Sequence, residues 1–390
     1  MTSPLGANVT LDQLEQDPHP ALARLREQEP VSWIPALEGW LVTRYDLVLE
    51  AMRDPARFTV DDPRFSTARV IGPSMLSLDG EQHARHRAPF VAPFRAGAVR
   101  ERFAEAAAHE ADQLIDALEA GGPSGGGELR RAFAGPLAAA IVTRALGQER
   151  DDVPLVLACY EQIVGAVTEI TAGRGDGAEG REAFATLSAR LKHVVDDPGR
   201  DSLLAAAARG SAELTHEQVI SNAAVLLFGG IETTEGMIAN TMLHLLGEPE
   251  GLQRVRDDPS LLDAAIEESL RLEPAAAVID RYATADTDLG GAEIGRGDLV
   301  RLSIAGANRD PSVFASPDQF DLARTGARRH LAFAQGPHVC VGVHLARLET
   351  RAGIARLLER LPELRLDRER PATIRGLVFR KPPTLHVVWG

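Results

Sequence analysis

The sequence predicts a mainly helical protein with a small β region, an α+β fold that forms one domain over residues 1–390. Apolar residues recur with helical periodicity along most of the chain. Strand-like stretches are few, and they cluster near 30–60, 285–305 and 375–390. One apolar segment, 215–247, is longer than an ordinary helix. We therefore expect a helical body around a long central helix, with strands from the two ends of the chain in a small sheet.

The expected helices follow the positions where apolar residues repeat every three to four residues. In chain order they cover 18–29, 44–53, 80–92, 98–119, 129–147, 153–170, 181–195, 215–247, 260–272 and 342–360. The expected strands are rich in β-branched and aromatic residues, and they cover Val31–Ile34, Trp40–Thr43, Asp288–Leu302 and Leu377–Val388. Pro382 and Pro383 indicate a turn inside the last stretch.

The segment 215–247 has recognisable ends and an unusual centre. A capping box at Thr215 begins it and Gly247 ends it. At ~1.5 Å per residue, such a helix is about 50 Å long, enough to cross the whole molecule. Its apolar centre continues into Gly229-Gly230-Ile231-Glu232-Thr233. Two glycines in mid-helix cost roughly 2 kcal/mol of helix stability relative to alanine. Glu232 is expected to be buried, so a buried charge directly follows this weakened turn of the helix.

Composition excludes several classes of function. The chain has 42 Lys+Arg against 56 Asp+Glu, a formal net charge of −14, so nucleic acid is not expected as the main partner. The longest apolar run, Ala223–Ile231, is about half of the ~20 residues that a membrane-spanning helix needs, and the start of the chain does not read as a signal peptide. We expect no membrane anchor. With only Cys159 and Cys340, a reducing compartment is expected, which favours a cytoplasmic protein.

Small residues surround Cys340. The chain reads Phe333-Ala334-Gln335-Gly336-Pro337-His338-Val339-Cys340-Val341-Gly342, and helical spacing follows. Such a loop can turn backbone N–H groups towards a sulfur, and the start of a helix adds a positive dipole end, so both features favour a thiolate. A buried structural cysteine in front of a helix explains the same segment equally well. Cys159 lacks these surroundings and is expected to be such a structural residue.

Two further constellations are weaker when taken alone. Glu268 and Arg271 lie three residues apart and share one helical face, which is also typical of solvated ion pairs. His83 and Arg87 lie four residues apart and project together. Two donors on one helical face suit an anion, although a plain surface stripe explains them as well.

Taken jointly, these segments resemble the cytochrome P450 superfamily, the haem-thiolate monooxygenases, in its soluble bacterial form. The run 333–342 is similar to the haem-binding signature of that family. Glu268 and Arg271 match its Glu-x-x-Arg pair, and the run 229–233 matches the oxygen-binding groove of its long central helix. The resemblance implies the triangular fold of the family, with the long helix over the haem. Ala334 departs from the pattern, because the family usually has glycine there.

The resemblance implies haem b as the cofactor, with Cys340 as the axial thiolate ligand of the iron. The residues that it implies around the cofactor are Gly229, Phe333 and Gly342, with His83, Arg87, Arg281 and His338 as donors to the propionates. Anions in a largely apolar pocket need such charge-assisted donors. Glu232 and Thr233 are implied as the catalytic pair that brings protons to the distal oxygen. Glu268 and Arg271 are implied as a structural core pair.

By analogy with the family, mostly small and apolar side chains line the substrate pocket. The segments that the analogy points to contribute Val70, Ile71, Met75, Ile163, Val167, Val225, Phe228, Ala276, Ala277, Val278, Leu377 and Val378. They favour a medium-sized or bulky hydrophobic small molecule, such as a terpenoid, polyketide or steroid-like ring system. The same side chains also suit plain core packing.

The family chemistry implies a monooxygenase that inserts one atom of O2 into its substrate by hydroxylation or epoxidation, in secondary or xenobiotic metabolism. Electrons would come from a separate ferredoxin with its NAD(P)H-dependent ferredoxin reductase, because the chain has no room for a flavin domain. Such carriers are acidic, so we expect a local basic face near the cysteine loop. The candidates for it are Arg328, Arg329, Arg347 and Arg351.

Two alternatives stay open beside this reading. The first is a peroxide-driven haem-thiolate peroxygenase, and the intact pair of Glu232 and Thr233 argues against it, because peroxide already brings its own protons. The second is a non-catalytic haem-binding or recruitment module. Modules of that kind tend to lose the ligand or the groove residues, and both are present here.

Overall fold

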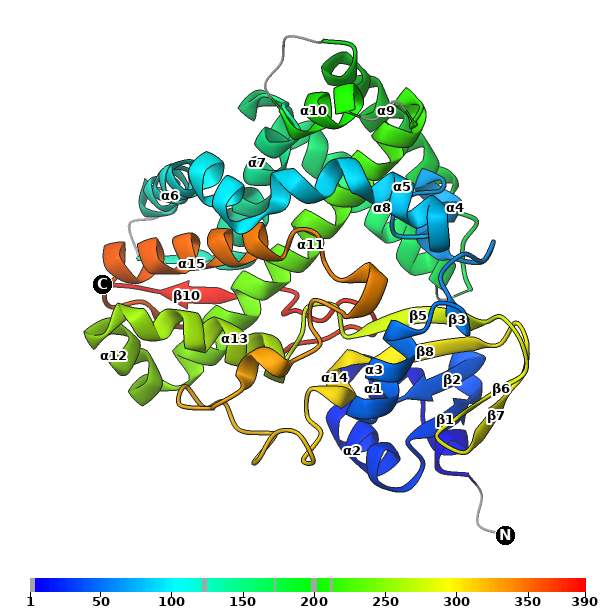
Figure 1. The fold of residues 1–390 in the computed structure, drawn as a ribbon. Helices are drawn as coiled ribbons and strands as arrows, with labels where there is room; N and C mark the ends of the chain where they lie inside the picture. Colours follow the sequence, from blue (N-terminus) through cyan, green and yellow to red (C-terminus); the bar gives the residue numbers. More distant parts are fainter. Residues whose placement is uncertain (1–3, 121–124, 172, 198–201, 211–212) are drawn as a thin grey trace.

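The computed structural model describes residues 4–120, 125–171, 173–197, 202–210 and 213–390. Helices form most of the molecule, and the largest group of strands gathers at one corner, towards the N-terminus (Figure 1). The expected mainly helical fold with a small β region is therefore confirmed. The longest helix runs diagonally through the middle of the molecule (Figure 1).

The largest sheet has five strands in the order β1-β2-β8-β5-β3. Its strands are β1 (Val31–Ile34), β2 (Gly39–Val42), β3 (Phe58–Thr59), β5 (Val278–Ala283) and β8 (Leu299–Ser303), while β6 (Thr287–Leu289) and β7 (Ala292–Ile294) form a separate hairpin. β2 and β8 run parallel, and the other pairs are antiparallel. β5 lies entirely outside the expected strand regions, because Asp280 and Arg281 interrupt its apolar pattern. It places Arg281 opposite Val300 of β8.

The C-terminal stretch does not join this sheet, contrary to the expectation of one sheet made from both chain ends. β10 (His386–Val388) pairs with β4 (Gly126–Glu128) and β9 (Arg365–Leu366) in a separate sheet. Before β10 the segment makes only isolated bridges, at Arg375, Phe379 and Lys381. The two prolines that follow have no backbone N–H to donate, so the pairing cannot continue there.

Most helices begin and end close to their expected positions, because caps and breaks in the apolar pattern mark their ends. Apart from the central helix, they are α1 (Leu11–Gln16), α2 (His19–Gln28), α3 (Tyr45–Arg53), α4 (Ser66–Ile71), α5 (Gly80–Val91), α6 (Ala96–Ala120), α7 (Gly135–Ala145), α8 (Val153–Thr171), α9 (Ala178–Val195), α10 (Leu203–Gly210), α12 (Pro249–Asp257), α13 (Leu262–Leu272), α14 (Ile304–Ala307) and α15 (Val343–Arg360). Five short helices were not predicted from the sequence, namely α1, α4, α10, α12 and α14.

The central helix is α11 (His216–Gly247). It begins as expected, because the Thr215 hydroxyl accepts from the Gln218 N–H and the Gln218 side chain accepts from the Thr215 N–H. Its centre is buried, and it packs against α7, α9, α13 and α15 (Figure 1). The central helix therefore lies in the middle of the helical part and contacts most of the other long helices. The turn that contains its two glycines lies deep inside the molecule.

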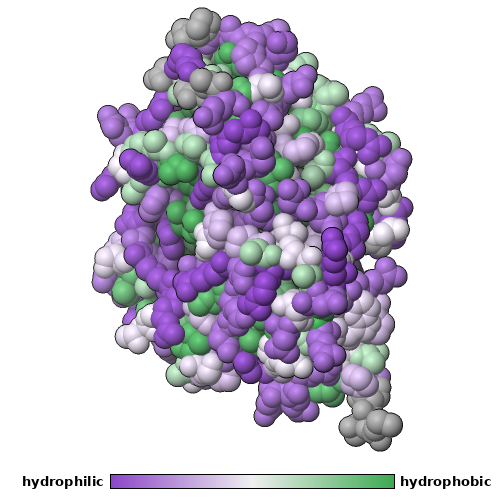
Figure 2. All heavy atoms as spheres, turned by 45° about the vertical axis from the view of Figure 1, so that its right-hand side comes forward, coloured by the Kyte–Doolittle hydropathy of each residue, from purple (hydrophilic) through white to green (hydrophobic). Residues whose placement is uncertain are grey.

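One described helix, Arg150–Thr171, is long and apolar enough to cross a membrane by length and composition alone. It packs against α4, α7 and α9, and it directs Tyr160, Ile163 and Val167 into the interior. At least some of its apolar side chains are therefore buried in the core of the protein. On the face shown in Figure 2, polar and charged side chains cover most of the surface, and hydrophobic ones lie in small separate groups.

Candidate active site

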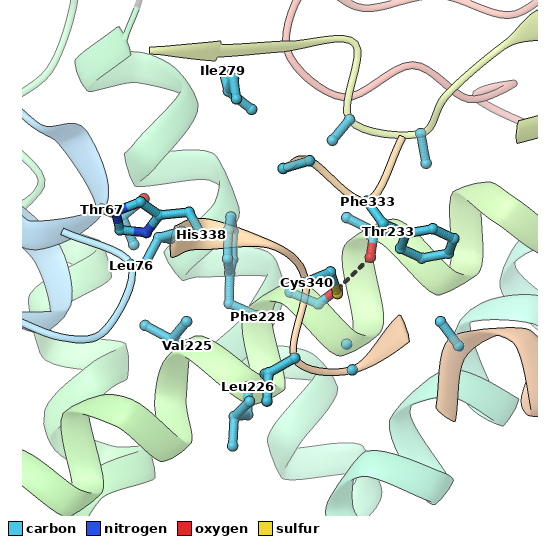
Figure 3. A pocket seen from close by; sticks show the side chains of 18 of the residues that line it. Thr67, Leu76, Val225, Leu226, Phe228, Thr233, Ile279, Phe333, His338 and Cys340 are labelled. Atoms are coloured by element: carbon cyan, nitrogen blue, oxygen red, sulfur yellow. Dashed lines mark hydrogen bonds between the residues drawn. The ribbon is translucent and has the colours of Figure 1, made fainter. Parts of the chain in front are cut away.

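A cavity of about 340 Å³ lies beside the middle of α11. Its walls come from α11, the loop around Cys340, strand β5 and the C-terminal segment around Phe379. Figure 3 shows Thr233 of α11 close to Cys340, with Phe228 and Val225 further along the same helix. The runs 229–233 and 333–342, which lie far apart in the sequence, therefore meet at one site.

The loop before α15 places the sulfur of Cys340 on the cavity. The Cys340 N–H donates to the carbonyl oxygen of Phe333 at 2.9 Å. Gly336 has a φ of 74°, and a Cβ there would lie 2.6 Å from the carbonyl oxygen of Met52, so only glycine fits. Ala334 has a φ of 55°, in the left-handed region where an L-residue is strained. Alanine in place of the family's glycine therefore costs backbone energy without preventing the loop from forming.

The protein surroundings alone do not make Cys340 a thiolate, which corrects the sequence-based argument. Burial raises the pKa of its thiol, and the opposing influence of the Gly342 N–H, Arg87 and Arg347 does not overcome that effect. A metal ion bound to the sulfur deprotonates a thiol outright. The thiolate therefore depends on what the sulfur binds. Cys159 is buried, and burial raises the pKa of its thiol as well, as suits a structural residue.

The two glycines of α11 meet different surroundings. Gly230 packs against α7, where a Cβ would lie 3.1 Å from Val142. Gly229 lines the cavity, and a Cβ there would meet nothing within 4 Å. The missing side chain at Gly229 thus leaves room for a ligand against the helix, one turn before Thr233.

Glu232 and Thr233 face different ways. Thr233 lines the cavity, and its hydroxyl donates to the carbonyl oxygen of Gly229 at 2.5 Å. Glu232 is 3% exposed and turns away from the cavity, because its carboxylate forms an ion pair with Lys381 (2.7 Å) and accepts a hydrogen bond from the Tyr160 hydroxyl. Of the expected catalytic pair, the structure therefore brings only Thr233 to the wall, since successive helical residues point about 100° apart.

Three of the four expected propionate donors, Arg87, Arg281 and His338, line the cavity. Arg281 is 5% exposed and donates to the carbonyl oxygen of Asp280 at 2.8 Å. Within the described ranges it makes no ion pair, and burial lowers its pKa to about 10. A buried guanidinium without a carboxylate in contact fits an anionic ligand.

His83 lies directly beside this edge, with its ring centroid 4.3 Å from that of His338. Its Nε2 is buried and has no hydrogen-bond partner in the part of the chain that the structure describes. Burial, together with His338 and Arg87, lowers the pKa of His83 to about 4. The orphaned nitrogen, the unpaired guanidinium and the sulfur on the cavity wall together fit a haem with its two carboxylates.

Glu268 and Arg271 form a fully buried bidentate pair on α13, with bonds of 2.9 and 2.8 Å. Arg271 donates its other N–H groups to three backbone carbonyls of the segment 308–319, at 2.6 to 3.0 Å. Arg324 adds another bond to Glu268 at 2.8 Å. We call Glu268, Arg271 and Arg324 the locked cluster. It fastens α13 to the chain that leads into the Cys340 loop, and none of its side chains lines the cavity.

Seven of the twelve expected substrate contacts line the cavity, namely Met75, Val167, Val225, Phe228, Ala276, Val278 and Val378. The other five do not. Val70, Ile71 and Ile163 pack in the main core, while Ala277 and Leu377 face a smaller pocket beside Leu14 and Leu22. The correction has a common cause, because neighbours on a helix or an extended segment point to different sides, so a lining segment also supplies core residues.

Several residues that were not expected from the sequence also line the cavity, among them Thr67, Leu76, Thr171, Ile279 and Phe379. Phe379 packs edge-on against Phe228, with ring centroids 5.6 Å apart. Lys381, two residues further on, was missed as well. A signal for it existed, since the chain contains only two lysines, Lys192 and Lys381.

A long helix over a cavity, a cysteine sulfur on its wall and a cationic edge define a haem protein of the thiolate-ligated class. A family model described as "Cytochrome P450" matches residues 188–388. The chain is 36% identical over 370 residues to "Cytochrome P450 monooxygenase PikC" of Streptomyces venezuelae, covering 90% of this chain and 85% of that protein. It is 33% identical over 368 residues to "Vitamin D(3) 25-hydroxylase" of Pseudonocardia autotrophica, covering 90% and 88%.

Among solved structures, a complex of P450BioI with an acyl carrier protein that carries hexadec-9Z-enoic acid is similar to this fold. The TM-score is 0.87 at 29% identity, over 96% of this chain and 99% of that chain. The chain belongs to the cytochrome P450 family. It is a bacterial-type monooxygenase with haem b held by a cysteine thiolate, and it inserts one atom of O2 into a hydrophobic small molecule.

Proposed function

We propose that Cys340 is the axial ligand of the haem iron and that His83, Arg87, Arg281 and His338 hold the propionates. The observation that carries this assignment is that the sulfur lines one cavity with Arg87 and Arg281, which have no carboxylate partner among the described residues, while the unpartnered Nε2 of His83 lies at its edge. His338 lines the same cavity and lies 2.8 Å from Asp79, a carboxylate that a propionate would have to replace. When bound, the haem supplies O2 activation, which a thiolate ligand promotes by pushing electron density towards the iron. The chain's own residues bind the cofactor and the substrate, exclude water and deliver protons.

Thr233 is the proposed group that hands protons into the cavity, with Glu232 as its supply. The overall reaction takes O2, two electrons and two protons, places one oxygen atom in the substrate and releases the other as water. The Thr233 hydroxyl lies on the cavity wall beside the open space at Gly229. A hydroxyl can donate one proton while it accepts another. Glu232 has to turn towards Thr233 to supply it, because its carboxylate points the other way at rest.

The substrate is proposed to be a medium-sized or bulky hydrophobic molecule of secondary or xenobiotic metabolism. The cavity walls are mostly aliphatic, and Phe228 and Phe379 are aromatic contacts on the α11 side. The Thr171 hydroxyl donates to the carbonyl oxygen of Val167 at 2.8 Å and accepts from the Ser66 hydroxyl at 3.0 Å. It adds a polar spot to the wall, where a substrate hydroxyl can bind. A hydroxylase named for vitamin D(3) among the relatives supports this class.

Electrons are proposed to come from a ferredoxin and its NAD(P)H-dependent reductase, in the cytoplasm. Of the four expected basic residues, Arg347 pairs with Glu267 and Arg351 pairs with Asp263, at 2.5 and 2.9 Å. Arg328 and Arg329 are exposed, and the Arg328 side chain approaches Glu267 only to 3.9 Å. An acidic carrier would therefore meet mainly Arg328 and Arg329, beside the cysteine loop.

The experiment that tests this function begins with a panel of hydrophobic compounds, screened for the low-to-high spin change of the haem. A compound that gives the change is then incubated with ferredoxin, reductase, NAD(P)H and isotopically labelled O2. One labelled oxygen atom in the product is the expected result. Product that forms faster with hydrogen peroxide than with the electron carriers would establish the peroxygenase instead. A protein that binds haem but converts no compound of the panel by either route would point to the recruitment module.

A further inference from the structure

A group of charged side chains lies behind Thr233, on the side of α11 that faces away from the cavity. Its centre is Lys381, whose ammonium group pairs with Glu232 at 2.7 Å and with Glu235. The two carboxylates lie three residues apart on one face of the helix. We call Lys381, Glu232 and Glu235 the shared-lysine cluster. At its edges, the Tyr160 hydroxyl donates to Glu232 and Arg130 pairs with Glu235 at 3.1 Å.

The cluster is almost dry. Glu232 is 3% and Glu235 is 5% exposed, and the Lys381 side chain is 10% exposed. Buried carboxylates require partners of opposite charge, and the two cations, Lys381 and Arg130, balance the two acids. Burial, strengthened by the nearby carboxylates, raises the pKa of Tyr160, so its hydroxyl stays a donor.

Lysine at this position is a specific choice in this chain, which contains 42 Lys+Arg and only two lysines. An ammonium group is compact and has three donors that can be aimed in different directions. It can therefore bind one oxygen from each of two carboxylates. A guanidinium favours two parallel bonds to a single carboxylate, as Arg271 makes with Glu268.

The segment that carries Lys381 is held from both sides. Arg380 is buried and pairs with Glu273 at 2.6 Å, and Lys381 is bridged through its backbone to Arg375. Gly236 lets this region approach α11, because a Cβ there would lie 2.8 Å from the Cβ of Ala275. The backbone that carries Lys381 is thus held in place beside α11.

Both carboxylate oxygens of Glu232 are occupied, one by Lys381 and the other by Tyr160. To hand a proton to Thr233, Glu232 has to take one up from solvent and to give up these partners. A buried ammonium group left alone would oppose that movement strongly. Glu235 removes this obstacle, because Lys381 keeps one ion pair when Glu232 leaves.

We propose that Lys381 and Glu235 are positioning residues that hold Glu232 away from the cavity and let it turn to Thr233 without leaving an unpaired buried charge. This inference rests on the proposed function of Glu232 and Thr233 in proton delivery. It adds two residues to the reaction, and neither of them lines the cavity.

The first test reads the cluster directly. The holoenzyme is labelled with ¹⁵N-lysine and studied by NMR as its reduced carbon monoxide complex, where only Lys192 and Lys381 give signals. We expect a slowly exchanging ammonium signal from Lys381 and none from the exposed Lys192. Glu232→Gln should keep that signal, because Glu235 still holds the lysine, whereas the double variant with Glu235→Gln should lose it. Loss of the signal in Glu232→Gln alone would overturn the shared arrangement.

The second test measures product formed per NAD(P)H consumed, with a compound that gives the spin change. We expect Lys381→Met to lower this ratio by about tenfold and to release hydrogen peroxide. The tenfold loss is a part of the rate enhancement of 10²- to 10⁴-fold that a general acid contributes. Glu235→Gln should lower it too, and Lys381→Arg should restore part of it. A ratio equal to wild type in Lys381→Met or in Glu235→Gln contradicts the proposal, and the second variant serves if the first does not fold.

Two controls separate the possible failures. Lys192→Met removes the other lysine, which is exposed on α9, and should leave the ratio unchanged. Thr233→Ala tests the proposed function itself. If Thr233→Ala stays fully coupled, the proton path is wrong as a whole. If Thr233→Ala loses product while Lys381→Met does not, only the role of the shared-lysine cluster fails.

Discussion

Two buried ion-pair clusters on two neighbouring helices of this protein are built in opposite ways. In the locked cluster, Arg271 uses all five N–H donors, on Glu268 and on three backbone carbonyls. In the shared-lysine cluster, Lys381 lies between two carboxylates and makes single bonds to each. The side chains of the locked cluster can satisfy their bonds in only one arrangement. In the shared-lysine cluster, Lys381 keeps one ion pair when one of the two carboxylates moves away.

The difference matches the position of each cluster relative to the cavity. The locked cluster fastens α13 to the chain before the Cys340 loop, where a fixed geometry for the sulfur is required. The shared-lysine cluster lies behind Thr233, where a proton has to be delivered and replaced. A planar fork suits a fixed joint, and a point charge suits an exchange of partners.

Breaking the locked cluster should have the largest effect. Arg271→Ala leaves Glu268 as a buried carboxylate without its bidentate partner, which costs about 3–5 kcal/mol of unfolding free energy. We expect little soluble holoprotein, measured by yield and by chemical denaturation. Arg351→Ala removes an exposed arginine on α15 and should change the stability by about 0–1 kcal/mol. Equal stability of the two variants would contradict the comparison.

The protein should begin to lose stability on acidification at a higher pH than the titration of its carboxylates alone would cause, because of a histidine near the locked cluster. Burial lowers the pKa of His244, which bonds to Ser269 at 2.9 Å, to about 4. An unfolded histidine has a pKa near 6.5. Between pH 6.5 and pH 4 the unfolded chain therefore binds more protons at this residue than the folded chain does, so the free energy of unfolding decreases as the pH is lowered. The loss from this residue approaches about 3 kcal/mol at pH 4. Denaturation at pH 7 and pH 5 should show a smaller difference for His244→Gln than for wild type, and an equal difference would refute the assignment.

Thr233→Ala should impair proton delivery, which the shared-lysine cluster supports, without disturbing the fold. The variant removes the hydroxyl that lies on the cavity wall. We expect normal haem content and substrate spin change, with product per NAD(P)H reduced by about tenfold and hydrogen peroxide released instead. Ser at the same position retains a hydroxyl and should recover much of the product, so a serine variant as uncoupled as alanine would count against proton transfer.

The smallest effect is expected outside both clusters, in the cysteine loop. Ala334 has a φ of 55°, which costs an L-residue roughly 1–2 kcal/mol, while glycine loses about 0.5–1 kcal/mol more entropy on folding than alanine does. Ala334→Gly should therefore raise the unfolding free energy by about 0.5 kcal/mol. Thermal unfolding of the two proteins under identical conditions measures this, and a clear loss of stability in the glycine variant would show that the methyl group packs favourably.

The sequence predicted the parts of the site that are set by local pattern. The cap at Thr215, the glycines of α11 and the spacing of Glu268 and Arg271 act within one helix, so they can be read from a single segment. The positions of Arg281 and His338 on one edge came from the family resemblance. No local pattern in either segment indicates that they meet.

What the sequence could not predict depends on contacts between distant segments. The direction of the Glu232 side chain is decided by Lys381 and Tyr160, which lie 149 and 72 residues away in the chain. The same holds for β5, which pairs with β3 and β8 although its own pattern is interrupted by Asp280 and Arg281. The left-handed backbone of Ala334 is a property of the closed loop, so only the structure reveals it.

The central claim is that Cys340 holds the haem iron as a thiolate. The carbon monoxide difference spectrum of the reduced protein tests it most directly, with Cys340→Ser beside wild type and Cys159→Ser as the matched control, since Cys159 is the second cysteine of the chain. We predict the thiolate-type band in wild type and in Cys159→Ser, and its loss in Cys340→Ser. A thiolate band that survives in Cys340→Ser, or one that is absent from haem-loaded wild type, would contradict the account.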